Sequence, residues 1–436
     1  MNKTKNPFSK LNKTTFLNMR GFILPMLLFG LAFGTFLPFV LFFFLPFCIA
    51  FLPFCVFSLP FFIFSIIVIV ILIINYQKTE RVARYHSLNP EVKQEINAIH
   101  GKKEVRILSI DGGGIRGIIP TVILREIERK TGKHIHELFD LVAGTSIGGI
   151  IAISLTTPDN EGKPLINTDK MLEIFVNNGK DIFKCEFKDK VKNLGGLIDE
   201  AYSCSGLVNI LKTHLKNIPL SRTLVPIMVT AFELRRYIPY NLKSWDSLND
   251  FERWFAGRAT SAAPTYFELA DGTNLQVNPF SFIDGGVILN NPSMAAYAEA
   301  KLLFPDATDF SMLSIGTGER HEDVNPEVAK DWGVAWIRPL INIMFDGSSR
   351  AIDIQMSEIL PKGSYIRLQP ELPKNLMAMD NVSAENIKNL VAHAENFVVE
   401  NSHKIEKICK ALRIPVFFGE NKEKLENIFK AFLQRH

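Results

Sequence analysis

Residues 105–155 read VRILSI-DGGGIRG-IIPTVILREIERKTG-KHIHELF-DLVAGTSIGG-IIAISL. A β-branched apolar run ends at Asp111 and three glycines, and apolar residues then recur at helical spacing as far as Gly132. A second short apolar run, 139–143, leads into a turn around Ser146, after which helical spacing resumes. This order of strand, glycine-rich turn, helix, strand, sharp turn and helix predicts an α/β fold with a parallel sheet.

The second turn, Gly144-Thr145-Ser146-Ile147-Gly148, matches the Gly-x-Ser-x-Gly pattern of a nucleophile elbow. The serine of such an elbow sits on a strained turn with its hydroxyl exposed, and glycines at both sides avoid a clash with a Cβ atom. The helix that follows directs backbone N–H groups toward developing negative charge. The pattern therefore predicts Ser146 as a nucleophile, with an ordinary glycine-rich turn as the alternative.

The first turn, residues 111–117, can direct several consecutive N–H groups at one anion. That anion could be a phosphate or the oxyanion of an acyl-transfer intermediate. Gly112, Gly114 and Gly117 also satisfy G-x-G-x-x-G, but a dinucleotide site expects an acidic residue at the end of the next strand, where Asp140 instead begins it. The Lys-Ser/Thr pair of a P-loop is missing as well. An oxyanion role is favoured, and nucleotide binding is the alternative.

A serine nucleophile needs a base, and one candidate lies far along the chain. The apolar run 280–283 ends in Asp284, which two glycines follow. An aspartate has a reference pKa of about 3.9, so burial would have to raise it for this role. Local sequence alone favours a turn residue that hydrogen-bonds its own backbone. His321, after the predicted strand 310–315, is the alternative base.

Composition excludes several other classes of function. The net charge of +4 is modest, and no basic patch alternates with aromatic residues as nucleic-acid binding would require. The five cysteines are scattered, which is typical of a reducing compartment and indicates neither a disulfide framework nor a zinc site. His134 and His136 have no Asp or Cys nearby, so we predict no metal site.

The N-terminal region differs in character, because residues 21–77 contain no Asp, Glu, Lys, Arg or His. As one helix this stretch would be roughly 85 Å long, against about 30 Å of hydrocarbon, which is enough for two spans. Pro46 and Pro53 mark a turn between predicted spans at 22–45 and 54–74. Basic residues on both sides place both ends in the cytoplasm. A re-entrant hairpin in one leaflet is the alternative.

Taken together, the motifs of the soluble part resemble the patatin-like phospholipase family. The resemblance covers roughly residues 105–369 and rests on DGGGIRG (111–117), GTSIGG (144–149), ATSAAPTYF (259–267), DGG (284–286) with Asn290-Asn291-Pro292, and SIGTG (314–318). It implies a three-layer α/β/α domain with a mostly parallel central sheet. It also implies cleavage of acyl esters of phospholipids and other lipids, without calcium or another cofactor.

The resemblance also implies a role for each motif residue. Ser146 is the nucleophile and Asp284 is its base, without a histidine, which overrides the local interpretation of Asp284 as a turn residue. Arg116 supports the first turn. The family's oxyanion hole corresponds to three glycines of that turn, Gly112, Gly113 and Gly114. Every catalytic motif residue is intact, so nothing in the sequence indicates an inactive copy.

We therefore expect a membrane-anchored lipid acyl hydrolase of the phospholipase A or lysophospholipase type, acting through a Ser-Asp dyad and an acyl-enzyme. The alternatives are a lipid acyltransferase using the same site and a non-hydrolytic lipid- or nucleotide-binding membrane protein. Expected partners are an acyl-lipid substrate and the bilayer, without nucleic acid, and a protein activator is left open. The expected segments are a basic cytoplasmic N-terminus (1–20), a membrane hairpin (21–77), a linker (78–103), the catalytic domain (104–370) and a helical tail (371–436).

Overall fold

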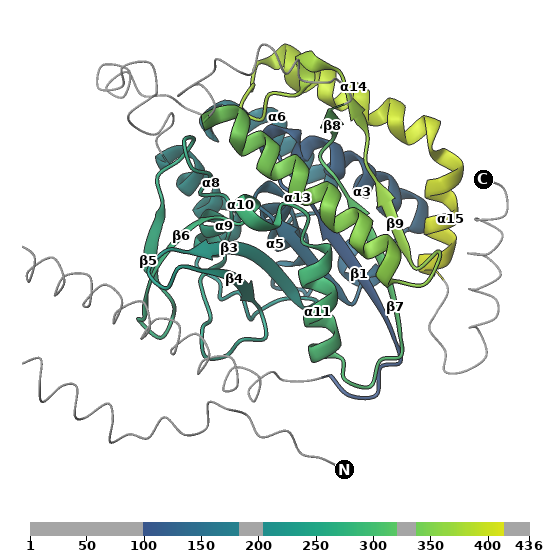
Figure 1. Cartoon of the computed structure of the whole chain (residues 1–436), viewed down its shortest axis with the longest axis horizontal. Helices are drawn as coiled ribbons and strands as arrows, with labels where there is room; N and C mark the ends of the chain where they lie inside the picture. The colour runs from purple at the N-terminus through teal and green to yellow at the C-terminus, as the bar shows by residue number, and fades with distance from the viewer. Residues whose placement is uncertain (1–98, 183–203, 321–336, 414–436) are drawn as a thin grey trace, which may run out of the picture. The chain divides into compact units, whose positions relative to one another are not determined.

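The computed structural model describes residues 99–182, 204–320 and 337–413, all within the compact unit that begins at Tyr85. An eight-stranded mixed sheet forms its centre (Figure 1). Five strands are parallel, in the order β3 (Ile227–Glu233), β2 (Leu141–Thr145), β1 (Glu104–Ile110), β7 (Asp309–Ile315) and β9 (Tyr365–Leu368). Three strands are antiparallel to their neighbours: β4 (Ile238–Lys243) and β6 (Pro279–Asp284), which pair with β3, and β5 (Ala270–Thr273), which pairs with β6. A separate two-stranded sheet joins β8 (Glu319–Arg320) to β10 (Glu371–Leu372).

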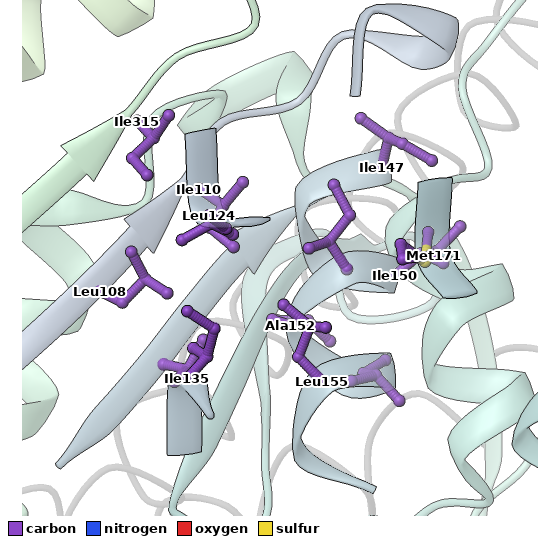
Figure 2. Packing of buried hydrophobic residues seen from close by; sticks show 14 of the residues in the cluster. Leu108, Ile110, Leu124, Ile135, Ile147, Ile150, Ala152, Leu155, Met171 and Ile315 are labelled. Carbon is purple, nitrogen blue, oxygen red and sulfur yellow. The ribbon is translucent and has the colours of Figure 1, made fainter. Parts of the chain in front are cut away.

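Helices cover both faces of the sheet (Figure 1). Successive side chains of a strand point to opposite faces, and those of β1 alternate accordingly between two buried clusters. Leu108 and Ile110 belong to the larger cluster, and Val105 and Ile107 belong to the smaller one. Figure 2 shows part of the larger cluster, where Ile110 and Ile315 of the sheet lie near Leu124. The described part of the chain is thus a three-layer α/β/α domain.

Each face has its own set of helices. Those contributing to the larger cluster are α3 (Ile118–Thr131), α4 (Ile135–Leu138), α5 (Ile147–Thr156), α6 (Thr168–Ile182), α8 (Ser205–Leu215), α9 (Arg253–Thr260), α14 (Ala384–Glu400) and α15 (Ser402–Arg413). Those contributing to the smaller cluster are α11 (Ser293–Leu303) and α13 (Ile337–Ile359). The short elements are the 3-10 helices η2 (Gly114–Gly117) and η4 (Lys374–Leu376), and α10 (Gly286–Leu289).

The predicted alternation of strands and helices in residues 105–155 is confirmed, with one shift in position. Gly132 ends α3 in the left-handed conformation, with φ 67°. The strand predicted at 139–143 instead begins at Leu141 and continues to Thr145, directly before the serine turn. It begins later because residues 135–138 form a short helix and Phe139 is the residue that ends it.

The C-terminal helices pack on the domain as expected from their apolar spacing. Ser383 caps α14, since its side chain accepts the Asn386 N–H. Leu390 of α14 and Ile405 of α15 are fully buried in the larger cluster, so these helices belong to the same core as the sheet. The rest of the predicted tail, 414–436, lies outside the described residues.

The prediction of a two-span membrane protein with a cytoplasmic catalytic domain is corrected. In the described ranges, no helix is both long enough and apolar enough to cross a bilayer. The longest, α13, has 23 residues, but arginine, aspartate and glutamate interrupt its apolar positions. The predicted hairpin at 21–77, together with residues 1–20 and most of the linker, lies outside the described residues.

Candidate active site

Ser146 lies at the sharp turn between β2 and α5, in a conformation that residues with a Cβ rarely adopt. Its backbone has φ 53° and ψ −123°. The flanking glycines make this turn sterically possible. A Cβ on Gly144 would lie 2.2 Å from the Gly148 carbonyl oxygen, and one on Gly148 would lie 2.3 Å from the Ile110 carbonyl oxygen. Larger residues at either position would force the turn open and move the serine.

Ser146 and Asp284 are in contact although they are 138 residues apart, and strand pairing explains how. β4 pairs with β3 along one edge, so β2 and β6 share the other edge. β2 runs parallel to β3 and β6 runs antiparallel, so their C-terminal ends meet: Thr145 pairs with Thr230, and Asp284 pairs with the next residue, Ala231. Ser146 Oγ donates a hydrogen bond to Asp284 Oδ2 over 2.6 Å.

The carboxylate of Asp284 is held on both oxygens and has no solvent exposure. Its Oδ1 accepts the Gly286 N–H over 2.7 Å, and Ser146 occupies Oδ2. Burial raises the pKa of Asp284 from 3.8 to about 7, although these two hydrogen bonds and the charge of Arg258 act in the opposite direction. A carboxylate with a pKa near neutrality is suited to accept and return a proton.

The raised pKa of Asp284 predicts a pH-dependent effect on stability. Because the folded state binds this proton more tightly than the unfolded chain, the stabilisation is complete below pH 3.8 and is lost as pH rises through about 7. We expect Asp284→Asn, which is neutral at every pH, to unfold at a higher temperature than wild type at about pH 8. The difference should shrink toward about pH 5 in thermal unfolding scans. A variant that is less stable than wild type at the higher pH would contradict the assigned pKa shift.

The glycine loop after β1 lies directly beside Ser146. A Cβ on Gly112 would be 3.1 Å from Ser146 Cβ. The Gly112 N–H already donates to the Asn290 carbonyl oxygen over 3.2 Å, so it is engaged within the protein. Among the described residues we find no acceptor for the N–H groups of Gly113 and Gly114. Of the three predicted oxyanion donors, these two are therefore the ones left available for a ligand.

Two arginines brace this loop. Arg116 Nε donates to the Gly113 carbonyl oxygen and its Nη1 donates to the Gly318 carbonyl oxygen, each over 3.3 Å. Arg367, on β9, forms a two-pronged ion pair with Asp111 at 2.8 and 2.5 Å. Sequence reasoning did not identify Arg367, because 256 residues separate it from its partner and no local pattern marks it. Asp111 consequently anchors the loop and does not face Ser146 as a base.

An apolar cavity reaches the serine. Its walls come from several helices that the central motif does not include, with Phe175 on α6, Leu207 on α8 and Phe345 on α13. Ile147 and Ile150 of α5 complete the wall nearest the turn and are labelled in Figure 2. Gly114 lines the same cavity, so a ligand there would meet the glycine loop and Ser146 together.

The other candidates from the sequence lie elsewhere. His134 and His136 stack on each other, and His134 lies 3.3 Å from Glu128 on the far end of α3. Within residues 99–182, 204–320 and 337–413, no group of three or more His, Cys, Asp or Glu side chains is arranged to hold a metal ion. His321, the alternative base, lies outside the described residues.

Comparisons with known proteins indicate the family of the chain. The family model described as patatin-like phospholipase matches residues 108–297. Patatin-like protein 2 of Arabidopsis thaliana is 30% identical over 325 residues, which cover 65% of this chain and 80% of that protein. Calcium-independent phospholipase A2-gamma of Homo sapiens is 28% identical over 71% of this chain and 40% of its own length. Probable inactive patatin-3-Kuras 1 of Solanum tuberosum is 26% identical over 70% of this chain and 90% of its own length. On this evidence, the chain belongs to the patatin-like phospholipase family.

Proposed function

We propose that this protein is a lipid acyl hydrolase that cleaves ester bonds through Ser146 and Asp284. The observation that supports the proposal most strongly is the 2.6 Å hydrogen bond from Ser146 Oγ to a fully buried carboxylate. Family membership alone would not suffice, since one relative bears the name of a probable inactive protein. Here Ser146 contacts a carboxylate whose pKa burial raises, and Ser146 and Gly114 of the glycine loop line the same cavity.

In the proposed reaction, Ser146 Oγ attacks the ester carbonyl carbon while Asp284 takes the hydroxyl proton. The N–H groups of Gly113 and Gly114 stabilise the negative charge that forms on the carbonyl oxygen. Asp284 then gives its proton to the departing alcohol, and an acyl-enzyme remains on Ser146. A water molecule attacks this ester, its proton passes to Asp284, and the fatty acid leaves as the proton returns to Ser146. The proposed chemistry uses groups of this chain alone, without a metal or cofactor.

The proposed substrate is a phospholipid or another acyl lipid, cleaved in the manner of a phospholipase A or lysophospholipase. The cavity beside Ser146 is lined almost wholly by apolar side chains, which suits a hydrocarbon chain and would disfavour a charged ligand. A relative named calcium-independent phospholipase A2-gamma supports the choice of phospholipid among acyl lipids.

The test is a product assay with vesicles of mixed phospholipids. The proposal predicts release of free fatty acid and formation of lysophospholipid, both measured by mass spectrometry. An added alcohol acceptor distinguishes acyl transfer, which would yield a new ester in place of fatty acid. Tight lipid binding without turnover, or saturable binding of ATP or NAD with no ester cleavage, would contradict the proposal.

The space in the cavity should determine the length of the acyl chain that the enzyme prefers. Leu207 is buried against the cavity, and Leu207→Trp would fill part of it. We expect the ratio of kcat/KM for a long-chain over a short-chain nitrophenyl ester to fall by about tenfold or more. The matched control is Leu302→Trp, since Leu302 is 45% exposed on α11 and does not line the cavity. If Leu207→Trp has the wild-type unfolding temperature and the wild-type ratio of kcat/KM values, the acyl chain of the substrate does not bind in this cavity.

A further inference from the structure

Thr260, the last residue of α9, contacts the backbone of the nucleophile. The Ser146 N–H donates a hydrogen bond to Thr260 Oγ1 over 2.9 Å, and Thr260 Oγ1 lies 2.7 Å from the carbonyl oxygen of Thr230. A hydroxyl has one proton, and a carbonyl oxygen can only accept. Thr260 must therefore donate to Thr230 and accept from Ser146. The hydroxyl thus links the backbone of the serine turn to the backbone of β3.

The position of Thr260 is tightly constrained by its surroundings. Its side chain has no solvent exposure. A Cβ on Gly149 would lie 2.8 Å from Thr260 Cγ2 and 3.1 Å from its Oγ1, so only glycine at 149 leaves room for the threonine. The elbow pattern accounts for Gly144 and Gly148 but not for a third glycine. The approach of Thr260 explains why GTSIGG continues with Gly149.

Thr145, the residue before Ser146, is also held by a threonine of β3. Thr145 Oγ1 lies 2.7 Å from Thr230 Oγ1 and donates to the Leu289 carbonyl oxygen over 2.7 Å. With its proton used there, Thr145 accepts from Thr230. Thr145, the last residue of β2, is consequently tied to β3 through its side chain, and Ser146, which follows it, is tied to β3 through its backbone N–H and Thr260. These contacts oppose relaxation of the turn at Ser146, whose φ of 53° is strained.

We propose that Thr260 is a positioning residue, which holds the strained backbone of Ser146 so that Oγ stays directed at Asp284. The inference rests on the proposed function, because it requires Ser146 to act as the nucleophile. The same contact directs the Ser146 N–H into the protein, away from the cavity. The N–H groups of the glycine loop, and not that of Ser146, would then stabilise the negative charge that forms on the substrate oxygen.

Removing the hydroxyl should allow the turn to relax. Thr260→Val preserves the shape of the side chain but leaves the Ser146 N–H and the Thr230 carbonyl without their partner. Because the proposed role concerns the nucleophile, kcat should fall about ten- to a hundredfold while KM changes little. Thr260→Ser retains the hydroxyl and should restore kcat to within a few-fold of wild type. Thr260→Ala removes the hydroxyl without placing a methyl group against the Thr230 carbonyl, and it replaces the valine variant if that protein does not fold.

The experiment compares these variants with wild type, using a soluble short-chain ester and the rate of labelling by a fluorophosphonate. Thermal unfolding is measured on each protein. Thr213→Val is the matched control, because Thr213 is exposed on α8 and its hydroxyl donates to its own helix. Slow labelling and low kcat in Thr260→Val or Thr260→Ala, with recovery in Thr260→Ser, would support the inference.

Two results would overturn it. Hydroxyl-free variants that unfold at a lower temperature but keep the wild-type kcat and labelling rate would show that Thr260 only stabilises the fold. A folded Thr260→Ser protein as slow as Thr260→Ala would show that the hydroxyl is not the group that matters. Ser146→Ala separates this inference from the proposed function. If that variant still hydrolyses the ester, the proposed function fails; if it is inactive while Thr260→Ala equals wild type, only the positioning role fails.

Discussion

Replacing Ser146 by alanine is expected to abolish ester hydrolysis, with kcat falling by about 10⁴- to 10⁶-fold. The reason is that no second nucleophile in the described part of the chain has the same setting. Ser261 also lines the cavity, but its hydroxyl donates to the Gly257 carbonyl oxygen of α9, so its contact is with backbone. The measurement is fatty acid release from vesicles together with turnover of a soluble ester.

The control for this experiment is Ser357→Ala, because Ser357 is an exposed residue of α13 whose hydroxyl bonds the Ile354 carbonyl oxygen. This control should hydrolyse the ester as fast as wild type, which would show that the loss of activity in Ser146→Ala does not come from the way the variant proteins are prepared. Full activity in Ser146→Ala would refute the assignment of the nucleophile. So would an inactive Ser261→Ala protein beside an active Ser146→Ala protein.

Replacing Asp284 by asparagine is expected to lower kcat by about 10⁴-fold. Asparagine has nearly the same shape: its amide oxygen can still accept the Gly286 N–H, and its NH2 group can donate to Ser146 Oγ, but it cannot take the proton. Wild-type kcat/KM should rise with pH through about 7, because the base works only when ionised and burial raises its pKa to that value. The variant should lack this rise.

Asp271→Asn serves as the control for the base, since Asp271 is an exposed residue on β5 beside the strand that carries Asp284. Its pH profile should match that of wild type. Activity in Asp284→Asn within a few-fold of wild type would exclude this carboxylate as the base.

The position of the proposed nucleophile could be predicted from sequence because a short motif specifies its turn. A strand, two glycines at fixed spacing and a helix are enough to specify the turn at Ser146. Gly144 is required by its approach to Gly148 within the turn, whereas Gly148 is required by the approach of Ile110 on β1. The proposed base could not be predicted in this way. Asp284 meets Ser146 because β2 and β6 share one edge of β3, a pairing that no local pattern encodes. Only the family resemblance raised Asp284 above a turn residue.

Long-range contacts also account for what sequence reasoning missed. The ion pair between Asp111 and Arg367 and the hydrogen bond between Ser146 and Thr260 each join segments more than a hundred residues apart. The family resemblance implied three glycines as oxyanion donors without distinguishing them, whereas a backbone hydrogen bond to Asn290 distinguishes Gly112 from the other two. The membrane prediction rested on the length of the uncharged stretch 21–77, its prolines and its basic flanks, and the helices of the described ranges do not support it.

The central claim is that Asp284 activates Ser146, and covalent labelling tests it most directly. Wild type and Asp284→Asn are treated with a fluorophosphonate across a range of pH, and the modified peptide is identified by mass spectrometry. We predict an adduct on Ser146 that forms faster as pH rises through about 7 in wild type, and forms slowly without this dependence in the variant. An adduct on another residue, or equal labelling rates in the two proteins, would contradict the account.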